Sequence, residues 1–169
     1  TAKIVKKKYK KASVIIGTNL FAHVDKLDSF IKSVKMLLDT EKGIFVTESH
    51  YAVDIVDDLQ YDSIYHEHLR FYLVKPLVYF MEKHGFKIID AIRIPNYRGS
   101  IRITATLNKS IKPHNSVKRI LDYEKKRGFY SQSKYIKFRN DIIKSKNKLL
   151  RILNGIKKKG KNIVGIGCP

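Results

Sequence analysis

The sequence is poor in cysteine, in acidic residues and in long apolar runs. Cys168 is the only cysteine among 169 residues, which excludes an internal disulfide framework and a zinc site built from thiolates. No run of about 18 apolar residues occurs, so no transmembrane helix is predicted. The basic stretch at residues 1–11 lacks the apolar segment of a signal peptide, and the default expectation is a cytoplasmic protein.

The basic excess lies at the two ends of the chain. The sequence has 35 lysines and arginines against 15 acidic residues. Residues 1–11 hold six lysines and no acid, and residues 115–162 hold sixteen basic residues against three acidic ones, so residues 12–114 are nearly neutral. Apolar residues make up 43% of the chain, which is enough for the core of one domain.

The first half of the chain alternates between short apolar runs and helical periodicity. Residues 13–17 and 43–48 are apolar runs that predict buried strands, and the apolar spacing between them predicts a helix over residues 25–38. The order strand, helix, strand predicts a parallel pair joined by a crossover helix.

A second helix and an antiparallel pair of strands follow. Pro76 opens a helical segment that runs to His84 and stops at Gly85. Residues 86–94 and 100–107 are β-rich runs joined by a short turn, and the second alternates apolar with polar residues. The predicted class is therefore α/β, with a mixed sheet that ends in an antiparallel pair.

The last third of the sequence is polar and helical. An apolar stripe at i, i+3, i+4, i+7 spacing runs through residues 115–159, with a break predicted near Gly128. We interpret this region as an arm or linker. Residues 162–169 have the pattern of a strand that runs into a glycine turn.

Two groups of polar residues lie where the predicted parallel strands end. Residues 18–23 follow the first strand, and residues 48–51 follow the second and lead toward residues 65–68. Ligands of open α/β sheets bind at the carboxyl ends of the strands. These positions are therefore candidates for a site.

Residues 65–68 read Tyr-His-Glu-His, a concentration of groups that move protons. A neutral imidazole takes a proton, a neighbouring carboxylate stabilises the imidazolium, and a tyrosine hydroxyl can donate to a developing enolate oxygen. In a helical turn Tyr65 and His68 share a face, whereas an extended chain pairs His66 with His68. The sequence is compatible with both arrangements.

Other interpretations of these residues stay open. A His-x-His pair in a surface loop is often merely polar. His66 and His68 with Glu67 are also compatible with a metal site, although no paired cysteines accompany them. His23 is compatible with a packing role, and Glu48 with a solvated strand end.

The charge distribution supports an alternative function. The basic ends would attract polyanions, so the alternative is a non-catalytic basic module that binds nucleic acid or another polyanion non-specifically. A charge run on helices is usually a solvated face. No base-reading element is evident, and we expect no preference for a particular DNA or RNA sequence.

Three stretches resemble consecutive blocks of the S-adenosylmethionine-dependent sugar C-methyltransferases, which methylate nucleotide-linked 4-keto-deoxysugars. They are S-V-I-I-G-T-N-L-F-A-H-V at residues 13–24, Y-D-S-I-Y-H-E-H-L-R-F-Y at 61–72 and P-N-Y-R-G-S-I-R-I at 95–103. The resemblance runs from the first helix to residue 169. It implies a Rossmann-like methyltransferase core between a zinc-binding N-terminal module and a C-terminal sugar-binding domain.

This resemblance implies a division of the chain. Residues 1–112 are expected to be the C-terminal half of the methyltransferase core, residues 113–161 a helical linker, and residues 162–169 the first strand of a truncated C-terminal domain. The zinc module and the glycine-rich cofactor loop are expected upstream of Thr1. We therefore expect this chain alone neither to bind S-adenosylmethionine usefully nor to transfer a methyl group, and to self-associate through an uncovered sheet edge.

The resemblance also implies roles for individual residues. His68 resembles the general base that removes the proton beside the ketone, with Tyr65 and Glu67 as supporting residues. His23 is similar to the histidine that helps hold the enolate oxygen, and Asn19 lies where the family's core passes the cofactor. The wall that binds the nucleotide-sugar is expected at Tyr51, Gly99, Ser100 and Arg102. No metal ligand and no membrane contact are expected.

Overall fold

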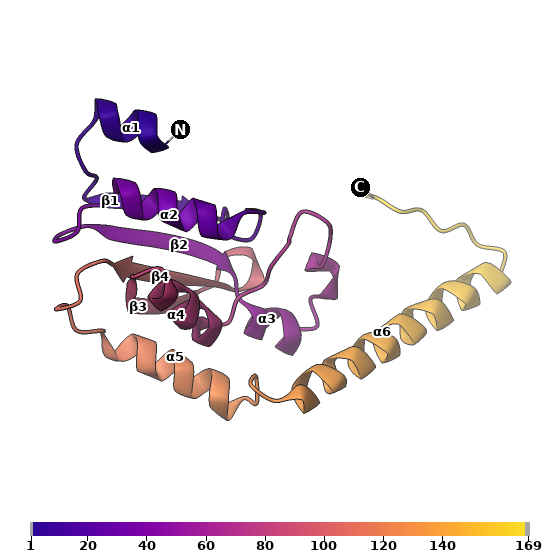
Figure 1. Ribbon diagram of the computed structural model, residues 1–169. Coiled ribbons are helices and arrows are strands. Elements are labelled where there is room, and N and C mark those ends of the chain that lie inside the picture. The colour runs from indigo at the N-terminus through magenta and orange to yellow at the C-terminus, as the bar shows by residue number, and fades with distance from the viewer. Residues whose placement is uncertain (1, 168–169) are drawn as a thin grey trace.

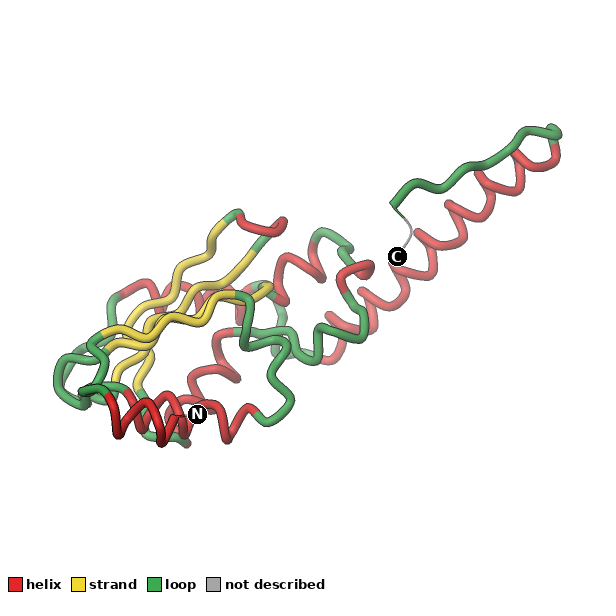
Figure 2. The backbone as a smooth tube through the Cα atoms, turned by 90° about the horizontal axis from the view of Figure 1, so that it is seen from above, coloured by secondary structure: helices red, strands yellow, loops and turns green. Residues whose placement is uncertain are grey.

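The computed structural model describes residues 2–167 as a four-stranded mixed sheet, with helices packed on it and a long helix that leaves it as an arm (Figures 1 and 2). The strand order is β1-β2-β4-β3. In chain order the elements are α1 (Ala2–Lys8), β1 (Val14–Thr18), α2 (Leu27–Leu37), β2 (Ile44–His50), α3 (Ala52–Asp57), η1 (Tyr61–Ser63), α4 (Val74–Lys83), β3 (Lys87–Ile94), η2 (Asn96–Arg98), β4 (Ser100–Thr106), α5 (Asn115–Lys126) and α6 (Gln132–Lys158).

The parallel pair is present as predicted. β1 and β2 run side by side with Val14 opposite Ile44 and Thr18 opposite Glu48, and α2 is the connection between them. Because the strands are parallel, their carboxyl ends meet at one edge of the sheet. This strand, helix, strand unit is the building block of a Rossmann-like core.

The antiparallel pair is also confirmed. β4 pairs antiparallel with β3 on one side and with β2 on the other. A short turn at residues 95–99 joins β3 to β4. It lies at the same edge of the sheet as the end of β2, because Ser100 lies opposite His50. The α/β class with a mixed sheet is therefore the fold of the described chain.

An aromatic cluster holds the helices on one face of the sheet. The ring of Phe21 lies 5.8 Å from Phe30 of α2 and 6.1 Å from Phe80 of α4, measured between centroids. Phe45 of β2 contacts the same group and is fully buried. Because burying each aromatic side chain removes a large apolar area from water, this cluster ties α2 and α4 to the segment after β1 and to β2.

The burial predicted for the first strand is wrong. β1 is an edge strand, and its side chains Val14 and Ile16 are 51% and 65% exposed. The apolar run predicted a strand covered on both faces, but the described helices cover only the face opposite to these two side chains. β2, by contrast, is largely buried, as predicted.

The helical region after the sheet is only partly an arm. Its break lies at residues 127–131, around Gly128, as predicted. α5 packs on β3 and buries Val117 and Glu124, so it belongs to the sheet unit. α6 buries no residue and alone forms the arm, which both views show leaving the sheet. The domain boundaries at 112/113 and 161/162 stay predictions.

The strand predicted at residues 162–169 does not form as far as residue 167. Residues 161–167 follow α6 as a loop without a pairing partner, and a strand requires one. The remaining two positions, Cys168 and Pro169, lie outside the described residues. Across residues 2–167, no helix is both long enough and apolar enough to cross a membrane.

Candidate active site

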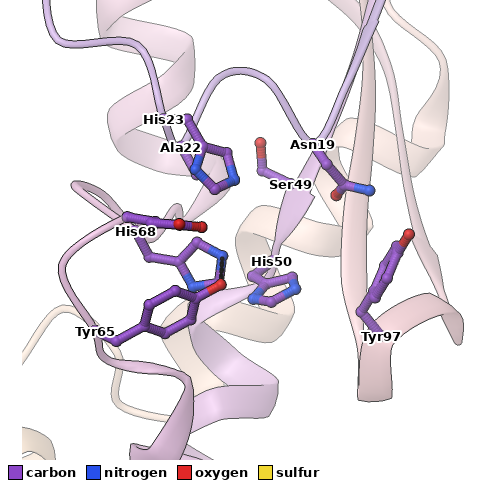
Figure 3. A pocket seen from close by; sticks show the side chains of 9 residues that line it. Asn19, Ala22, His23, Ser49, His50, Tyr65, His68 and Tyr97 are labelled. Carbon is purple, nitrogen blue, oxygen red and sulfur yellow. Dashed lines mark hydrogen bonds between the residues drawn. The ribbon is translucent and has the colours of Figure 1, made fainter. Parts of the chain in front are cut away.

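A pocket of about 330 Å³ lies at the carboxyl edge of β1 and β2 (Figure 3). This volume is at the lower end of the range for small-molecule sites, roughly 300–1,000 Å³. The pocket is lined by Asn19, Ala22, His23, Ser49, His50, Tyr65, Glu67, His68 and Tyr97.

Five of the residues singled out in the sequence converge in this pocket. Asn19 and His23 come from the segment after β1, and Tyr65, Glu67 and His68 come from the loop before α4. The two segments meet because the backbone N–H of Leu69 donates to the carbonyl of Ala22 at 3.1 Å. Strand-end placement thus predicted their proximity correctly.

His68 occupies a tight turn and is held at both ring nitrogens. Its backbone N–H donates to the Tyr65 carbonyl at 3.0 Å, and the Tyr65 hydroxyl lies 3.2 Å from its Nε2. The helical-turn alternative, with Tyr65 and His68 paired, is therefore the one the structure adopts. On the other side of the ring, Nδ1 lies 2.9 Å from the Ser63 carbonyl.

These contacts define the tautomer of neutral His68. A carbonyl oxygen only accepts hydrogen bonds, so the proton must sit on Nδ1 and be donated to Ser63. Nε2 then carries the lone pair and accepts from the Tyr65 hydroxyl. A histidine held in this way presents a base at Nε2 toward the pocket.

Two more histidines border His68. The ring of His23 lies 5.0 Å and that of His50 lies 4.8 Å from the His68 ring, between centroids. Burial lowers the pKa of His50 below its ordinary 6.5, and repulsion from His68 and His23 lowers it further. His50 is therefore neutral at pH 7 and does not add a positive charge beside the base.

Glu67 does not occupy the orienting position expected of a carboxylate. It lines the pocket, but within the described residues no hydrogen bond joins it to His68. The Ser63 carbonyl makes that contact instead. The sequence offered no signal for Ser63, because a backbone carbonyl belongs to every residue.

Two of the four residues expected in the substrate wall are buried outside the pocket. Tyr51 is fully buried, and its hydroxyl donates to Glu124 of α5 at 3.1 Å. Ser100 is also fully buried and donates to the carbonyl of Asn96 at 3.0 Å. Both hydroxyls are thus occupied by internal hydrogen bonds.

Gly99 and Arg102 also lie outside the pocket lining. A Cβ at Gly99 would stand 2.2 Å from an oxygen of Asp54, at a φ of +128°, so glycine is required there by close packing. Arg102 pairs with Glu48 at 2.9 Å. Glu48 is therefore not a solvated strand end, since it is 3% exposed and also accepts from Asn96.

Four lining residues were not among the predicted site residues, namely Ala22, Ser49, His50 and Tyr97. Ser49 and His50 end β2, and Tyr97 lies in the 95–99 turn with its ring centroid 5.8 Å from that of His50. Ser49 and His50 belong to the polar group noted at the end of the second strand. Tyr97 reaches the pocket only because β4 pairs with β2, which the sequence did not reveal.

The described residues fit only part of an S-adenosylmethionine site. Asn19 stands at the end of β1 with a left-handed backbone, φ 52°, and faces the pocket. Among residues 2–167, no strand leads into a glycine-rich turn that opens a helix, which is the usual support for such a cofactor. In this same range, no three His, Cys, Asp or Glu side chains gather as a metal-holding group.

The chain is similar to known C-methyltransferase sequences. Residues 95–169 match the family described as C-methyltransferase C-terminal domain. The chain is 26% identical over 161 residues to C-methyltransferase NovU of Streptomyces niveus, and the match covers 94% of this chain and 38% of that protein. The chain thus spans well under half the length of this relative.

Two solved structures share partial similarity. Magnesium protoporphyrin IX methyltransferase of Synechocystis PCC 6803 with bound SAH matches with a TM-score of 0.43 and 11% identity, over 57% of this chain and 45% of that one. The complex of M1.HpyAVI with SAM matches with a TM-score of 0.39 and 17% identity, over 64% and 50% of the two chains.

Proposed function

We propose, from the premise that the chain belongs to the C-methyltransferase family, that the whole protein methylates a carbon beside the ketone of a nucleotide-linked deoxysugar. The methyl donor in this proposal is S-adenosylmethionine. The role assigned to the present chain is the base end of the active site. The observation that carries this assignment is the Ser63, His68 and Tyr65 hydrogen-bond chain at the carboxyl ends of two parallel strands.

His68 takes the proton in this proposal. The bond between the substrate carbon and its hydrogen breaks, a bond from that hydrogen to Nε2 forms, and the electron pair moves onto the ketone oxygen as an enolate. Nδ1–H keeps donating to Ser63, so the imidazolium retains a partner for its positive charge. Nε2 has one lone pair, so the Tyr65 hydroxyl turns away from it before the substrate proton arrives and donates to the ketone oxygen as it becomes the enolate.

His23 assists at the enolate oxygen. It lines the same pocket, 5.0 Å from His68 between ring centroids, and comes from the segment after β1. A second donor placed where negative charge develops lowers the barrier, typically by a few kcal/mol for each donor. His50 is neutral at pH 7, so it adds no positive charge to the pocket.

Asn19, at the end of β1, is the residue that would border the methyl donor. When bound, S-adenosylmethionine supplies an electrophilic sulfonium methyl to the enolate carbon. Asn19 is the described residue placed to border it, because it ends the strand and faces the pocket opposite His68 (Figure 3).

Substitution of His68 in the whole protein tests this proposal. His68→Ala should reduce methyl transfer by about 10²- to 10⁴-fold and leave S-adenosylmethionine affinity nearly unchanged, because the base acts on the sugar. His66→Ala is the matched control, since His66 is exposed and does not line the pocket. Wild-type turnover by His68→Ala would contradict the role of His68.

A further inference from the structure

We propose that Ser49 and Tyr97 form the substrate-selecting wall of the pocket, where Ser49 hydrogen-bonds a ring substituent of the keto sugar and Tyr97 packs against its C–H face. This inference rests on the proposed function and adds the residues that choose the sugar. Both residues line the pocket beside the His68 group (Figure 3). Neither was among the residues implied by the family resemblance.

Ser49 has a buried hydroxyl without a partner. The residue is 4% exposed, and its Oγ is the buried side-chain polar atom in the described part of the chain that makes no hydrogen bond. Leaving a buried hydroxyl unpaired is unfavourable, so such atoms are rare and require a reason. The position of Ser49 in the pocket lining supplies one, because a sugar oxygen bound there would complete the hydrogen bond.

Ser100 shows what a purely structural serine looks like at the same edge. It is 0% exposed, and its hydroxyl donates to the Asn96 carbonyl at 3.0 Å. Near the paired ends of β2 and β4, Ser49 lies opposite Ile101 and Ser100 lies opposite His50, and both serines are buried. The hydroxyl of Ser100 has a hydrogen-bond partner within the protein, whereas that of Ser49 has none. Of the two serines, Ser49 is the one that lines the pocket.

Tyr97 is held in a conformation that tyrosine rarely adopts. Its φ is 51° and that of the following Arg98 is 62°, both in the left-handed region. The turn is fixed from outside, since Gln60 donates to the Arg98 carbonyl at 3.0 Å and Tyr51 N–H donates to Gly99 at 3.2 Å. Strain of this kind persists when surrounding contacts impose it, and it concentrates at functional sites.

The imposed turn presents the Tyr97 ring to the pocket. The side chain is 64% exposed, and its nearest aromatic neighbour is His50 at 5.8 Å between centroids. Figure 3 shows Tyr97 and Asn19 on one side, the Tyr65 and His68 pair on the other, and Ser49 between them. A sugar seated between these sides would place one face on the Tyr97 ring while its reacting carbon reaches His68.

The inference predicts that stability and binding change in opposite directions. Ser49→Ala removes an unsatisfied hydroxyl, so the thermal midpoint should stay equal or rise, while affinity for the sugar falls about tenfold. Ser100→Ala breaks an existing hydrogen bond and should lower the midpoint. A role for Ser49 in folding alone predicts that both variants lose stability.

Substitution of Tyr97 gives a second and independent test of the inference. Tyr97→Gly relieves the left-handed strain and should raise the thermal midpoint by about 2–4 °C, while sugar affinity falls about tenfold through loss of the ring. Tyr97→Phe keeps the ring and should retain affinity. Raised stability with lost binding is a combination that a merely structural tyrosine does not produce.

The experiment is calorimetric titration of the whole protein and its variants with a nucleoside-diphosphate-linked 4-keto-6-deoxyglucose, together with thermal unfolding of the 169-residue chain that carries the same substitutions. Weaker binding by Ser49→Ala and Tyr97→Gly, with unreduced stability, supports the inference. Wild-type affinity in both variants overturns it and leaves the proposed function standing. Failure of the unaltered whole protein to bind this probe contradicts the proposed function, and the inference with it.

Discussion

Glu124 on α5 is the internal group whose removal should destabilise the fold most clearly. It is 0% exposed and accepts four hydrogen bonds. Two come from backbone N–H groups at the start of α4, Val74 at 2.5 Å and Lys75 at 3.2 Å, and two come from the hydroxyls of Tyr51 at 3.1 Å and Tyr130 at 2.7 Å. A carboxylate at the amino end of a helix is also favoured by the helix dipole.

The magnitude follows from which donors lose their only partner. Val74 and Tyr51 are fully buried, so Glu124→Ala leaves two donors that water does not reach, at about 1–3 kcal/mol each. Tyr130 is 37% exposed and can turn to solvent. With the helix-terminus contribution of about 0.3–1 kcal/mol, the loss should be about 2–7 kcal/mol. Burial, followed by the charge of Glu124, raises the pKa of Tyr51, so this tyrosine stays protonated and keeps donating.

Urea unfolding followed by circular dichroism measures this loss. Glu124→Gln should lower the free energy of unfolding by less than Glu124→Ala, because glutamine keeps one acceptor oxygen. It should still be destabilising, because its NH₂ group would face the donors that the second carboxylate oxygen accepts from. Glu82→Gln is the control, since Glu82 is exposed on α4 and should change stability by less than about 0.5 kcal/mol. A loss below about 1 kcal/mol for Glu124→Ala would show that the hydrogen bonds to Glu124 contribute little.

Three further predictions concern other parts of the chain. Burial raises the pKa of Asp57, but hydrogen bonds from Lys134 and Arg127 lower it by more, so the net shift is downward from 3.8. The stabilisation that these bonds give the fold is therefore complete above pH 3.8 and is lost as the pH falls through the lowered pKa. Asp57→Asn should therefore cost about 1–2 kcal/mol at pH 7 in urea unfolding, unlike Asp141→Asn on α6. The pKa of His50 is lower in the folded chain than its ordinary 6.5, so as the pH falls the unfolded chain takes up this proton before the folded chain does and the fold loses stability. His50→Gln should therefore lessen the loss of stability between pH 7.5 and 5.5. An unchanged pH profile of stability would contradict this. Finally, a gel-shift competition should show salt-dependent binding of polyanions without sequence preference; selective binding at physiological salt would favour the basic-module alternative.

Periodicity and strand-end reasoning predicted most of the sheet and the location of the pocket. The apolar runs and the polar groups that follow them depend on local sequence, so β1, β2 and the convergence of Asn19, His23 and His68 could be foreseen. The burial of β1 could not, because an apolar run does not reveal what covers each face. The sequence predicts α5 to be part of a linker, because a glutamate such as Glu124 is usually exposed. Its burial depends on four hydrogen-bond donors from other segments, which the sequence does not identify.

The predicted substrate wall and the observed pocket lining differ for a common physical reason. Alternation along a strand says which residues share a face, but it does not say which hydroxyls are already satisfied inside the protein. Ser100 and Tyr51 were expected in the wall and instead complete internal hydrogen bonds, whereas Ser49 was passed over and has none. Tyr97 was missed because its left-handed backbone is imposed by tertiary contacts.

Exchange of solvent deuterium into the substrate tests the central claim most directly, because it reports proton removal separately from methyl transfer. A nucleotide-linked 4-keto-6-deoxysugar is incubated in D₂O with the whole protein, and deuterium at the carbons beside the ketone is followed by NMR. The account predicts exchange at one of these carbons with wild-type protein and with His66→Ala, and a loss of about 10²-fold or more with His68→Ala. Exchange by His68→Ala at the wild-type rate would contradict the assignment of this pocket as the site of proton abstraction.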